Sequence, residues 1–218
     1  MRTLHWLTAA FVVGVVAAVV LPGALADGST ASKLSTDKID SAEATFGDLA
    51  TDALCSAAKT TIALAPAVSF KPGEIPAGLV TKKAVSGLLH DPEEKWAVLL
   101  LTGQQIRDAF ERSVSSAPTP RTYFLQVSGL TVVYAPRAPR GRKVKSIRIG
   151  VVGINEAERY EVAMPQSLAD GGSGYFTIFG NAKKARSGAQ GMADVITNYV
   201  DSRGRVSYTG QGRIVVSG

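Results

Sequence analysis

The stretch that decides the fold class is YFLQVSGLTVVYAPRAPRGRKVKSIRIG, residues 123–150. Two runs within it, 123–136 and 142–150, are rich in β-branched and aromatic residues, and the turn sequence RAPRG separates them. This pattern predicts a β-hairpin. Since the strands of a hairpin pair antiparallel, the sequence favours antiparallel pairing over a doubly wound parallel sheet.

Helix and strand patterns alternate along the rest of the chain. Short apolar runs predict strands at 61–66, 95–101, 159–165 and 212–217. Apolar residues at helical spacing predict helices at 43–59, 81–89, 103–114 and 188–204. The helix at 103–114 follows a capping box made by Thr102 and Gln105. We therefore predict the fold class α/β mixed (α+β), a layered helix/sheet domain with largely antiparallel strands.

The first 26 residues carry the pattern of a secretory signal peptide. Arg2 precedes an apolar run that ends in the small-x-small motif Ala24-Leu25-Ala26. We predict cleavage before Asp27, which implies a secreted, periplasmic or cell-envelope protein with no remaining transmembrane span; the alternative is an uncleaved anchor. Residues 27–40 are small and polar, which predicts a flexible leader before a domain at 41–218.

Histidine and cysteine are scarce, and this limits the chemistry of the chain. His5 and His90 are the only histidines, and Cys55 is the only cysteine. These counts exclude an internal disulfide, a cysteine-based zinc site and a histidine-rich metal site. We predict no metal, no cofactor and no catalytic residue. His90 and Asp91 are adjacent on a turn, so we interpret them as structural rather than as an acid–base pair.

The function of two stretches, a glycine loop and a run of basic residues, can be interpreted in two ways each. The loop GGSG, 171–174, either brings a ligand close to bare backbone or serves only as a turn. The basic residues from Arg137 to Arg148 either bind an anionic polymer through weak contacts or form a solvated edge that prevents sheet aggregation. The formal charge of +6, which loss of Arg2 lowers to +5, is compatible with both. We expect no sequence-specific nucleic-acid binding.

Four stretches, in order and spacing, resemble the C-terminal domain of the secreted 5′-nucleotidase family. They are EATFGDLATDAL (43–54), LTGQQIRDAFERSV (101–114), YFLQVSGLTVVY (123–134) and LADGGSGY (168–175). The resemblance covers about Ser41 to Val216 and implies the fold of that domain. It also implies a role in gripping the nucleoside end of a substrate, because the family cleaves bonds in a separate two-metal metallophosphoesterase domain.

The resemblance implies six substrate-binding residues, which are Lys71, Phe124, Ser167, Gly171, Gly172 and Ser173. Phe124 matches an aromatic that stacks on the base. Ser167 stands where the family has a second stacking aromatic, and Ser173 where it has a carboxylate that holds the ribose hydroxyls. Lys71 ends PAVSFK (66–71), which corresponds to a family loop NGGGIR that supplies an asparagine and an arginine. A further family arginine falls at 40–42, where this chain has none.

These substitutions predict an exported, divergent member of the family with a degraded nucleoside- or nucleotide-binding pocket and no catalysis of its own. The alternative is a substrate-binding subunit of a nucleotide-hydrolysing enzyme that works with a separately encoded metallophosphoesterase chain. The expected ligand is a nucleoside or nucleotide in both cases.

Overall fold

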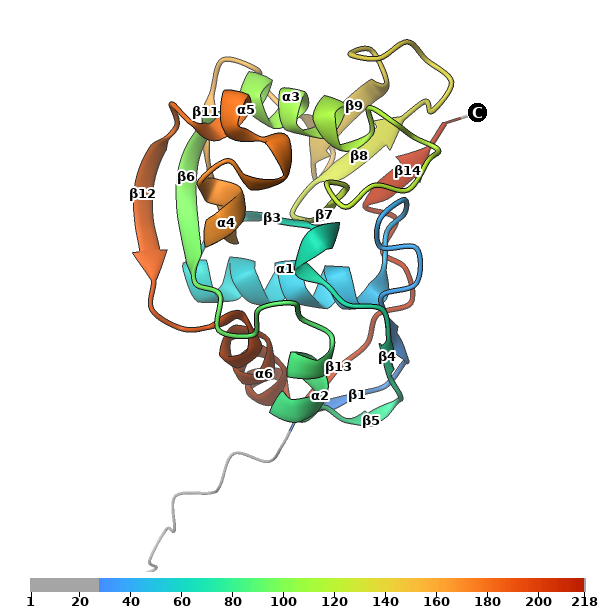
Figure 1. Cartoon of the computed structure of the whole chain (residues 1–218), viewed down its shortest axis with the longest axis vertical. Helices are drawn as coiled ribbons and strands as arrows, with labels where there is room; N and C mark the ends of the chain where they lie inside the picture. Colours follow the sequence, from blue (N-terminus) through green and yellow to red (C-terminus); the bar gives the residue numbers. More distant parts are fainter. Residues whose placement is uncertain (1–27, 218) are drawn as a thin grey trace, which may run out of the picture.

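The computed structural model describes residues 28–217 and shows a mixed helix and sheet domain (Figure 1). Its helices are α1 (Thr45–Ala58), α2 (Lys82–Gly87), α3 (Gly103–Ser113), α4 (Gln166–Ala169), α5 (Phe176–Phe179) and α6 (Met192–Arg203), with 3-10 turns η1 (Ala67–Ser69) and η2 (Gly172–Gly174). Its longer strands are β3 (Ile62–Pro66), β6 (Trp96–Thr102), β7 (Leu125–Ser128), β8 (Thr131–Tyr134), β9 (Val144–Ile149), β11 (Arg159–Pro165), β12 (Lys183–Gly188) and β14 (Ile214–Val216). Two-residue strands are β1 (Ser29–Thr30), β2 (Leu34–Ser35), β4 (Glu74–Ile75), β5 (Gly78–Leu79), β10 (Val152–Gly153) and β13 (Arg205–Val206).

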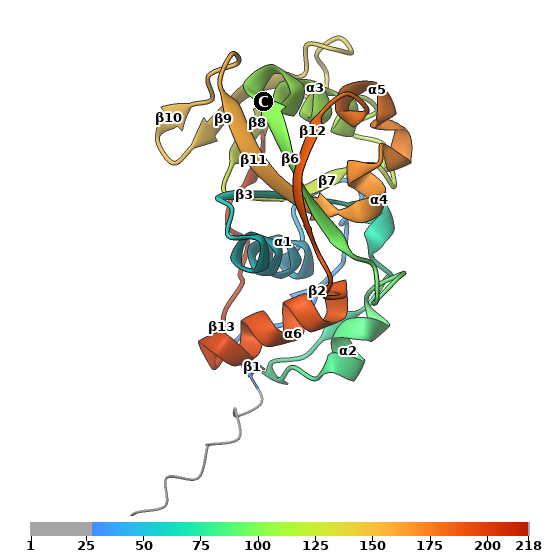
Figure 2. The same cartoon turned by 90° about the vertical axis from the view of Figure 1, so that its left-hand side faces the viewer.

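Two sheets form the centre of the domain. A five-stranded sheet has the order β12-β6-β11-β3-β7, and only its β11–β3 pair is parallel. A four-stranded sheet has the order β10-β9-β8-β14, with β14 parallel to β8. Helix α1 packs on β3 and β7, and α6 packs on the other side of α1 (Figures 1 and 2). The predicted mixed fold with mostly antiparallel strands is confirmed.

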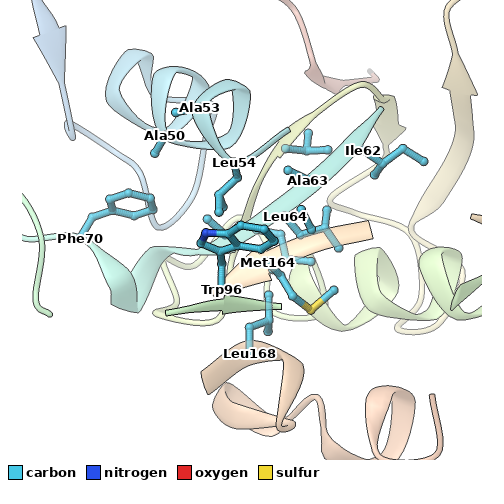
Figure 3. Close-up of a cluster of buried hydrophobic side chains, with 14 of the residues drawn as sticks. Ala50, Ala53, Leu54, Ile62, Ala63, Leu64, Phe70, Trp96, Met164 and Leu168 are labelled. Atoms are coloured by element: carbon cyan, nitrogen blue, oxygen red, sulfur yellow. The ribbon is translucent and has the colours of Figure 1, made fainter. Parts of the chain in front are cut away.

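The core lies between α1 and the five-stranded sheet. Leu54 of α1, Leu64 of β3, Trp96 of β6 and Met164 of β11 are all buried there (Figure 3). The strands that carry these residues read as continuous apolar runs in the sequence, because they are covered on both faces.

Helix α3 begins where its capping signal predicts. The Thr102 hydroxyl accepts the Gln105 N–H at 3.1 Å, and the Gln105 side chain accepts the Thr102 N–H at 2.9 Å. Ile106, Ala109 and Phe110 form its buried face. The helix is therefore fixed by local chemistry at its start and by apolar packing along its length.

The predicted hairpin forms only in part. β8 and β9 pair antiparallel, as predicted. The first run, however, divides at Gly129, so β7 joins the five-stranded sheet beside β3 while β8 joins the other sheet. Gly129 has φ +78°, and a Cβ atom there would lie 1.7 Å from the Thr61 carbonyl oxygen. Only glycine permits this close approach of two backbones, and the chain changes sheets at this point.

The prediction of a flexible leader at 27–40 is wrong for residues 28–40, which belong to the fold. β1 pairs with β13 and β5, and β2 pairs with β4. Leu34 is completely buried and Ile39 nearly so, and their burial holds the segment on the domain. The predicted signal peptide lies outside the described residues. Within residues 28–217, no helix has the length and apolar character that a membrane crossing requires.

A charge network joins α1 to the last strand. Arg213 donates two hydrogen bonds of 2.9 Å to the Asp52 carboxylate, which also accepts the hydroxyls of Ser128 at 2.5 Å and Tyr208 at 2.9 Å. The Glu43 carboxylate accepts the backbone N–H groups of residues 211–214. Together these bonds place β14 beside β8.

Asp48 is the unusual member of this network. Its side chain is fully buried, and neither carboxylate oxygen has a hydrogen-bond partner among the described residues. Burial raises the pKa of Asp48 to about 8, although Arg213 at 3.6 Å opposes the shift, and the carboxylates of Glu43 and Asp52 add to it. Three carboxylates surround one guanidinium that Asp52 already engages, so the neutral form of Asp48 is favoured.

We predict that Asp48→Asn makes the protein more stable than the wild type at alkaline pH. The folded state keeps a proton on Asp48 that the unfolded chain releases above its ordinary pKa of 3.8, so this group's contribution to stability falls as pH rises towards 8. The amide stays neutral throughout. The difference in melting temperature between Asp48→Asn and the wild type should therefore increase by at least about 3 °C from pH 5 to pH 9. A stability change of about 1 kcal/mol corresponds to about 2–4 °C for a domain of this size.

The matched control is Asp52→Asn, which loses charge-assisted bonds to Arg213 and should be less stable than wild type at every pH. If the melting temperatures of the wild type and of Asp48→Asn change in parallel with pH, Asp48 is ionised in the folded protein and the prediction is wrong.

Candidate functional site

The structure brings together the segments that carry the predicted site. In 66–71, the N–H groups of Ala67 and Val68 donate to the carbonyls of Phe124 and Thr122, each at 2.8 Å. The Tyr175 hydroxyl, at the end of the glycine loop, donates to the Tyr123 carbonyl at 2.6 Å. The segment around Phe124 therefore lies between the 66–71 segment and the glycine loop.

A fourth segment completes this assembly. The Arg121 N–H donates to the Asp40 carbonyl at 2.8 Å, so residues 35–40 lie against the same region. Lys38 in this segment has φ +55°, a backbone conformation that non-glycine residues seldom adopt. The connection from β2 to α1 is thereby bent into a wall beside η1.

A cleft of about 580 Å³ opens between these segments. Its lining residues are Ser35, Thr36, Asp37, Lys38, Ile39, Asp40, Ala67, Val68, Phe70, Pro72, Gly73, Glu74, His90 and Thr122. Its size is in the range of small-molecule sites, and it combines apolar walls with polar groups.

The charge of this cleft is acidic rather than basic. Glu74 pairs with Lys33 at 2.9 Å, whereas no ion pair engages Asp37 or Asp40 within residues 28–217. Lys38 is the one lysine in the lining, which contains no arginine. His90 also lines the cleft, while the Asp91 carboxylate accepts the Glu93 N–H at 3.0 Å and caps a turn. The surroundings of a ligand here are net negative.

None of the six predicted site residues is among those that line this cleft. Phe124 is only 2% exposed and belongs to the core. Lys71 lies next to two lining residues, and its carbonyl accepts the Thr36 hydroxyl at 3.0 Å. The assignment of substrate contacts to these residues stays a prediction, and the structure adds the segment 35–40 to the candidate site.

The glycine loop packs tightly on its own surroundings. Ser167 lies on α4, and its N–H donates to Glu94 at 2.9 Å. A Cβ atom at Gly172 would lie 2.6 Å from the Ser167 carbonyl oxygen, so Ser167 and the loop are in contact. Gly171 has φ +90° and Ser173 has φ +57°, which makes the loop a sharply folded turn.

Arg112 fills the space beneath this loop. Its guanidinium donates to the Ser173 carbonyl at 3.0 Å and lies 4.0 Å from the centre of the Tyr123 ring. A Cβ atom at Gly174 would lie 2.3 Å from the Arg112 Nη2 atom. The loop therefore encloses a cation stacked on an aromatic ring.

The aromatic residues after the glycine loop, Tyr175 and Phe176, lead into a short helix and not into a strand. Tyr175 follows η2 and is fully buried, with its ring stacked on Phe179 at 5.4 Å between centres. Phe176 begins the short helix α5 and is 69% exposed. The turn formed by the glycines continues into helix because the Tyr175 hydroxyl is held by Tyr123 and its ring by Phe179.

The sequence analysis missed two groups of residues. Arg112 lies in the helix predicted at 103–114, and nothing in its sequence spacing indicates that it turns towards the glycine loop. Asp37, Lys38 and Asp40 were assigned to a leader, although the apolar residues Leu34 and Ile39 in the same stretch are a signal of folded structure.

The thiol of Cys55 is the remaining reactive side chain in the described part of the chain. Cys55 is half-buried, and burial raises the pKa of its thiol. Within residues 28–217, no group of three or more His, Cys, Asp and Glu side chains is arranged to hold a metal ion.

Comparison with known proteins places this chain and its fold in a family. The sequence profile of the 5′-nucleotidase C-terminal domain matches residues 15–181. A snake venom 5′-nucleotidase from Naja atra is 30% identical over 128 residues, covering 55% of this chain, and an apyrase from Aedes aegypti is 28% identical over 211 residues, covering 89%. A solved 5′-nucleotidase precursor from Thermus thermophilus superposes with a TM-score of 0.79 at 26% identity over 87% of this chain.

The matches cover only part of those proteins. The chain spans 24% of the snake venom protein, 36% of the apyrase and 39% of the Thermus thermophilus chain. The family model matches residues 15–181, well over half of the chain, and the chain belongs to the 5′-nucleotidase C-terminal domain family.

Proposed function

We propose that the protein is an exported, non-catalytic binding module whose cleft does not hold nucleotides in the manner of its family. The observation that carries this proposal is the lining of the 580 Å³ cleft, in which Asp37 and Asp40 face one lysine and no arginine. A phosphate group carries about −2 charge at neutral pH, and carboxylates nearby repel it. A neutral or cationic ligand fits this cleft better than a nucleotide.

The glycine loop supports the same conclusion. Serines stand at 167 and 173, where the resemblance implies an aromatic ring and a carboxylate. Stacking on an aromatic ring contributes about 1–3 kcal/mol per base, and a hydrogen bond to a charged group about 1.5–3 kcal/mol. Without these groups, and with Arg112 bound inside the loop, specific affinity for a nucleotide is largely lost.

A second candidate is the substrate-binding subunit of a nucleotide-hydrolysing enzyme whose metallophosphoesterase is a separate chain. One observation favours it. Two apolar side chains near the site, Val68 and Phe176, are 42% and 69% exposed. Exposed apolar groups beside a site are suited to covering by another protein surface.

Binding of adenosine should be recoverable by substitution. We predict that Ser167→Phe with Ser173→Asp tightens adenosine binding at least about tenfold, because one ring and one carboxylate together supply more than about 1.4 kcal/mol. Aspartate tolerates the positive φ of position 173 better than most residues. Isothermal titration calorimetry measures the effect, with Ser167→Ala and Ser173→Asn as the matched control. A folded double variant that binds no better than wild type would show that the loop is only a turn.

Hydrolysis should be absent from the purified protein. With AMP, ADP or ATP and added Mg²⁺ or Mn²⁺, we expect phosphate release no greater than in a mock preparation. Turnover that survives repeated purification would refute the binding-module proposal. Turnover that requires a separately purified metallophosphoesterase, and increases when this chain is added, would establish the second candidate instead.

Export is tested by intact mass. We predict that the protein recovered from an exporting host begins at Asp27, since Ala24-Leu25-Ala26 ends a signal-peptide pattern. A mass that includes residues 1–26, recovered in the membrane fraction, would mean that the segment is retained as an anchor.

A further inference from the structure

The four-stranded sheet carries most of the exposed apolar side chains of the domain. Seven large apolar residues are exposed within residues 28–217, and four of them lie on this sheet or its turn. They are Val151, Val152, Val215 and Val216, and Val151 at the β9–β10 turn is 92% exposed. β10 and β14 are the two opposite edges of this sheet, so Val151 and Val152 form one exposed apolar pair and Val215 and Val216 another. Adjacent and strongly exposed apolar side chains such as Val151 and Val152 are suited to a contact with a partner.

The same sheet carries an uncompensated positive charge. Between Glu111 and Glu156 the sequence has eight basic residues and no acidic residue. Five of these cations are exposed, and none forms an ion pair with a described residue; they are Arg137, Arg140, Arg142, Lys145 and Arg148. These five cations lie in the loop before β9 and on β9, and Val151 and Val152 follow directly after β9. We call the five cations and these two valines the apolar–basic surface.

The loop that presents three of these arginines is firmly held. Lys143 is buried, and its ammonium group donates to the carbonyls of Ala117 at 2.8 Å and Pro136 at 2.5 Å. The Glu111 carboxylate accepts the N–H groups of Lys143 and Val144 at 3.0 and 2.8 Å. The arginines therefore project from an ordered base, which lowers the entropic cost of binding at this loop.

Protection of a sheet edge explains only part of this surface. β10 covers only the end of β9, so Lys145 on the uncovered part guards an edge against aggregation. Arg137, Arg140 and Arg142 lie in the loop beyond the strand, where no edge needs protection. The exposed valines increase the risk of aggregation instead of reducing it.

The apolar–basic surface is well placed for an external contact. The β8–β9 loop and the β9–β10 turn lie in the upper part of both views, at the end of the domain opposite α6 and β1 (Figures 1 and 2).

We propose that the apolar–basic surface binds the surface of an anionic phospholipid bilayer. The arginines and Lys145 engage lipid phosphates, and Val151 and Val152 enter the boundary between headgroups and acyl chains. A soluble polyanion would account for the cations alone, whereas a bilayer also gives the exposed valines an apolar environment. This role goes beyond the proposed function and does not depend on the contents of the cleft.

Vesicle sedimentation tests the proposal with the protein in the form that it has after export. Vesicles of phosphatidylcholine with about one third phosphatidylglycerol are compared with pure phosphatidylcholine vesicles, at about 0.05 M and about 0.5 M NaCl, since salt screens such contacts. We expect binding to the anionic vesicles that weakens strongly at high salt. Equal binding to both vesicle types, or none, would overturn the proposal.

Two variants separate the charged and the apolar contributions. The triple variant Arg137→Gln, Arg140→Gln, Arg142→Gln should bind at least about 25-fold more weakly, since each cation near an anionic surface contributes about fivefold. The double variant Val151→Ser, Val152→Ser should bind at least about fivefold more weakly at unchanged charge, since burying apolar groups adds to binding.

The matched control is the triple variant Lys83→Gln, Lys183→Gln, Arg205→Gln, which removes three exposed cations elsewhere on the domain. We expect its vesicle binding to weaken by less than about threefold, because salt screening limits the effect of distant charges. Melting temperatures verify that all variants fold. If the valine variant binds vesicles like wild type and soluble polyphosphate competes fully, the partner is a soluble polyanion and the bilayer proposal is wrong. If the control variant loses as much binding as the arginine variant, the attraction is only overall charge and the proposal is also wrong.

Discussion

The pair between Arg213 and Asp52 is the interaction on which the arrangement of the two sheets depends. Arg213 binds both carboxylate oxygens of Asp52 on α1, and it also donates to the Val127 carbonyl of β7 at 3.0 Å. A guanidinium bound to a carboxylate at two points fixes orientation as well as distance. Residues 214–216 follow directly and add a parallel strand to β8, so the pair sets where the second sheet lies relative to the first.

The candidate cleft depends on the same junction. Gln126 of β7 is completely buried, and its side chain accepts the Ala44 N–H at 3.0 Å and donates to the carbonyls of Ile39 and Ala42 at 2.9 and 2.7 Å. These bonds hold the wall of the cleft that carries Asp37 and Asp40. The backbone that carries the acidic residues of the cleft is thus held in the connection between β2 and α1.

The sequence predicts well those elements whose signals are local. The capping box at Thr102 and the apolar run of β6 require only neighbouring residues, and both elements form where expected. The two-residue strands β1 and β13 pair across about 175 residues and carry no apolar pattern, so their pairing cannot be seen in sequence. Gly129 lies inside the run 123–136 that was predicted as one strand, because the change of sheet depends on how closely the backbone approaches Thr61.

The side chains of the candidate site are harder to predict from sequence than the elements of the fold. Family resemblance indicated the segment 66–71, part of which lines the cleft, but it did not indicate the segment 35–40. It did not indicate which side chains face inward, because neighbouring residues in an extended segment point to opposite sides. Phe124 lies in the core, whereas the adjacent Tyr123 stacks on Arg112, and a single position along the chain separates these environments.

The charge network also has a consequence for how the chain is made. Glu43 and its partners at 211–214 are separated by 168 residues or more, so a ribosome synthesises α1 long before the residues that hold it in place. Contacts of such high sequence separation form slowly, since a long loop must close first. Until residue 214 emerges, Asp48 and Asp52 have no guanidinium to balance them, and early collapse around α1 is opposed by their hydration. The network that stabilises the folded domain therefore also delays the formation of that domain during synthesis.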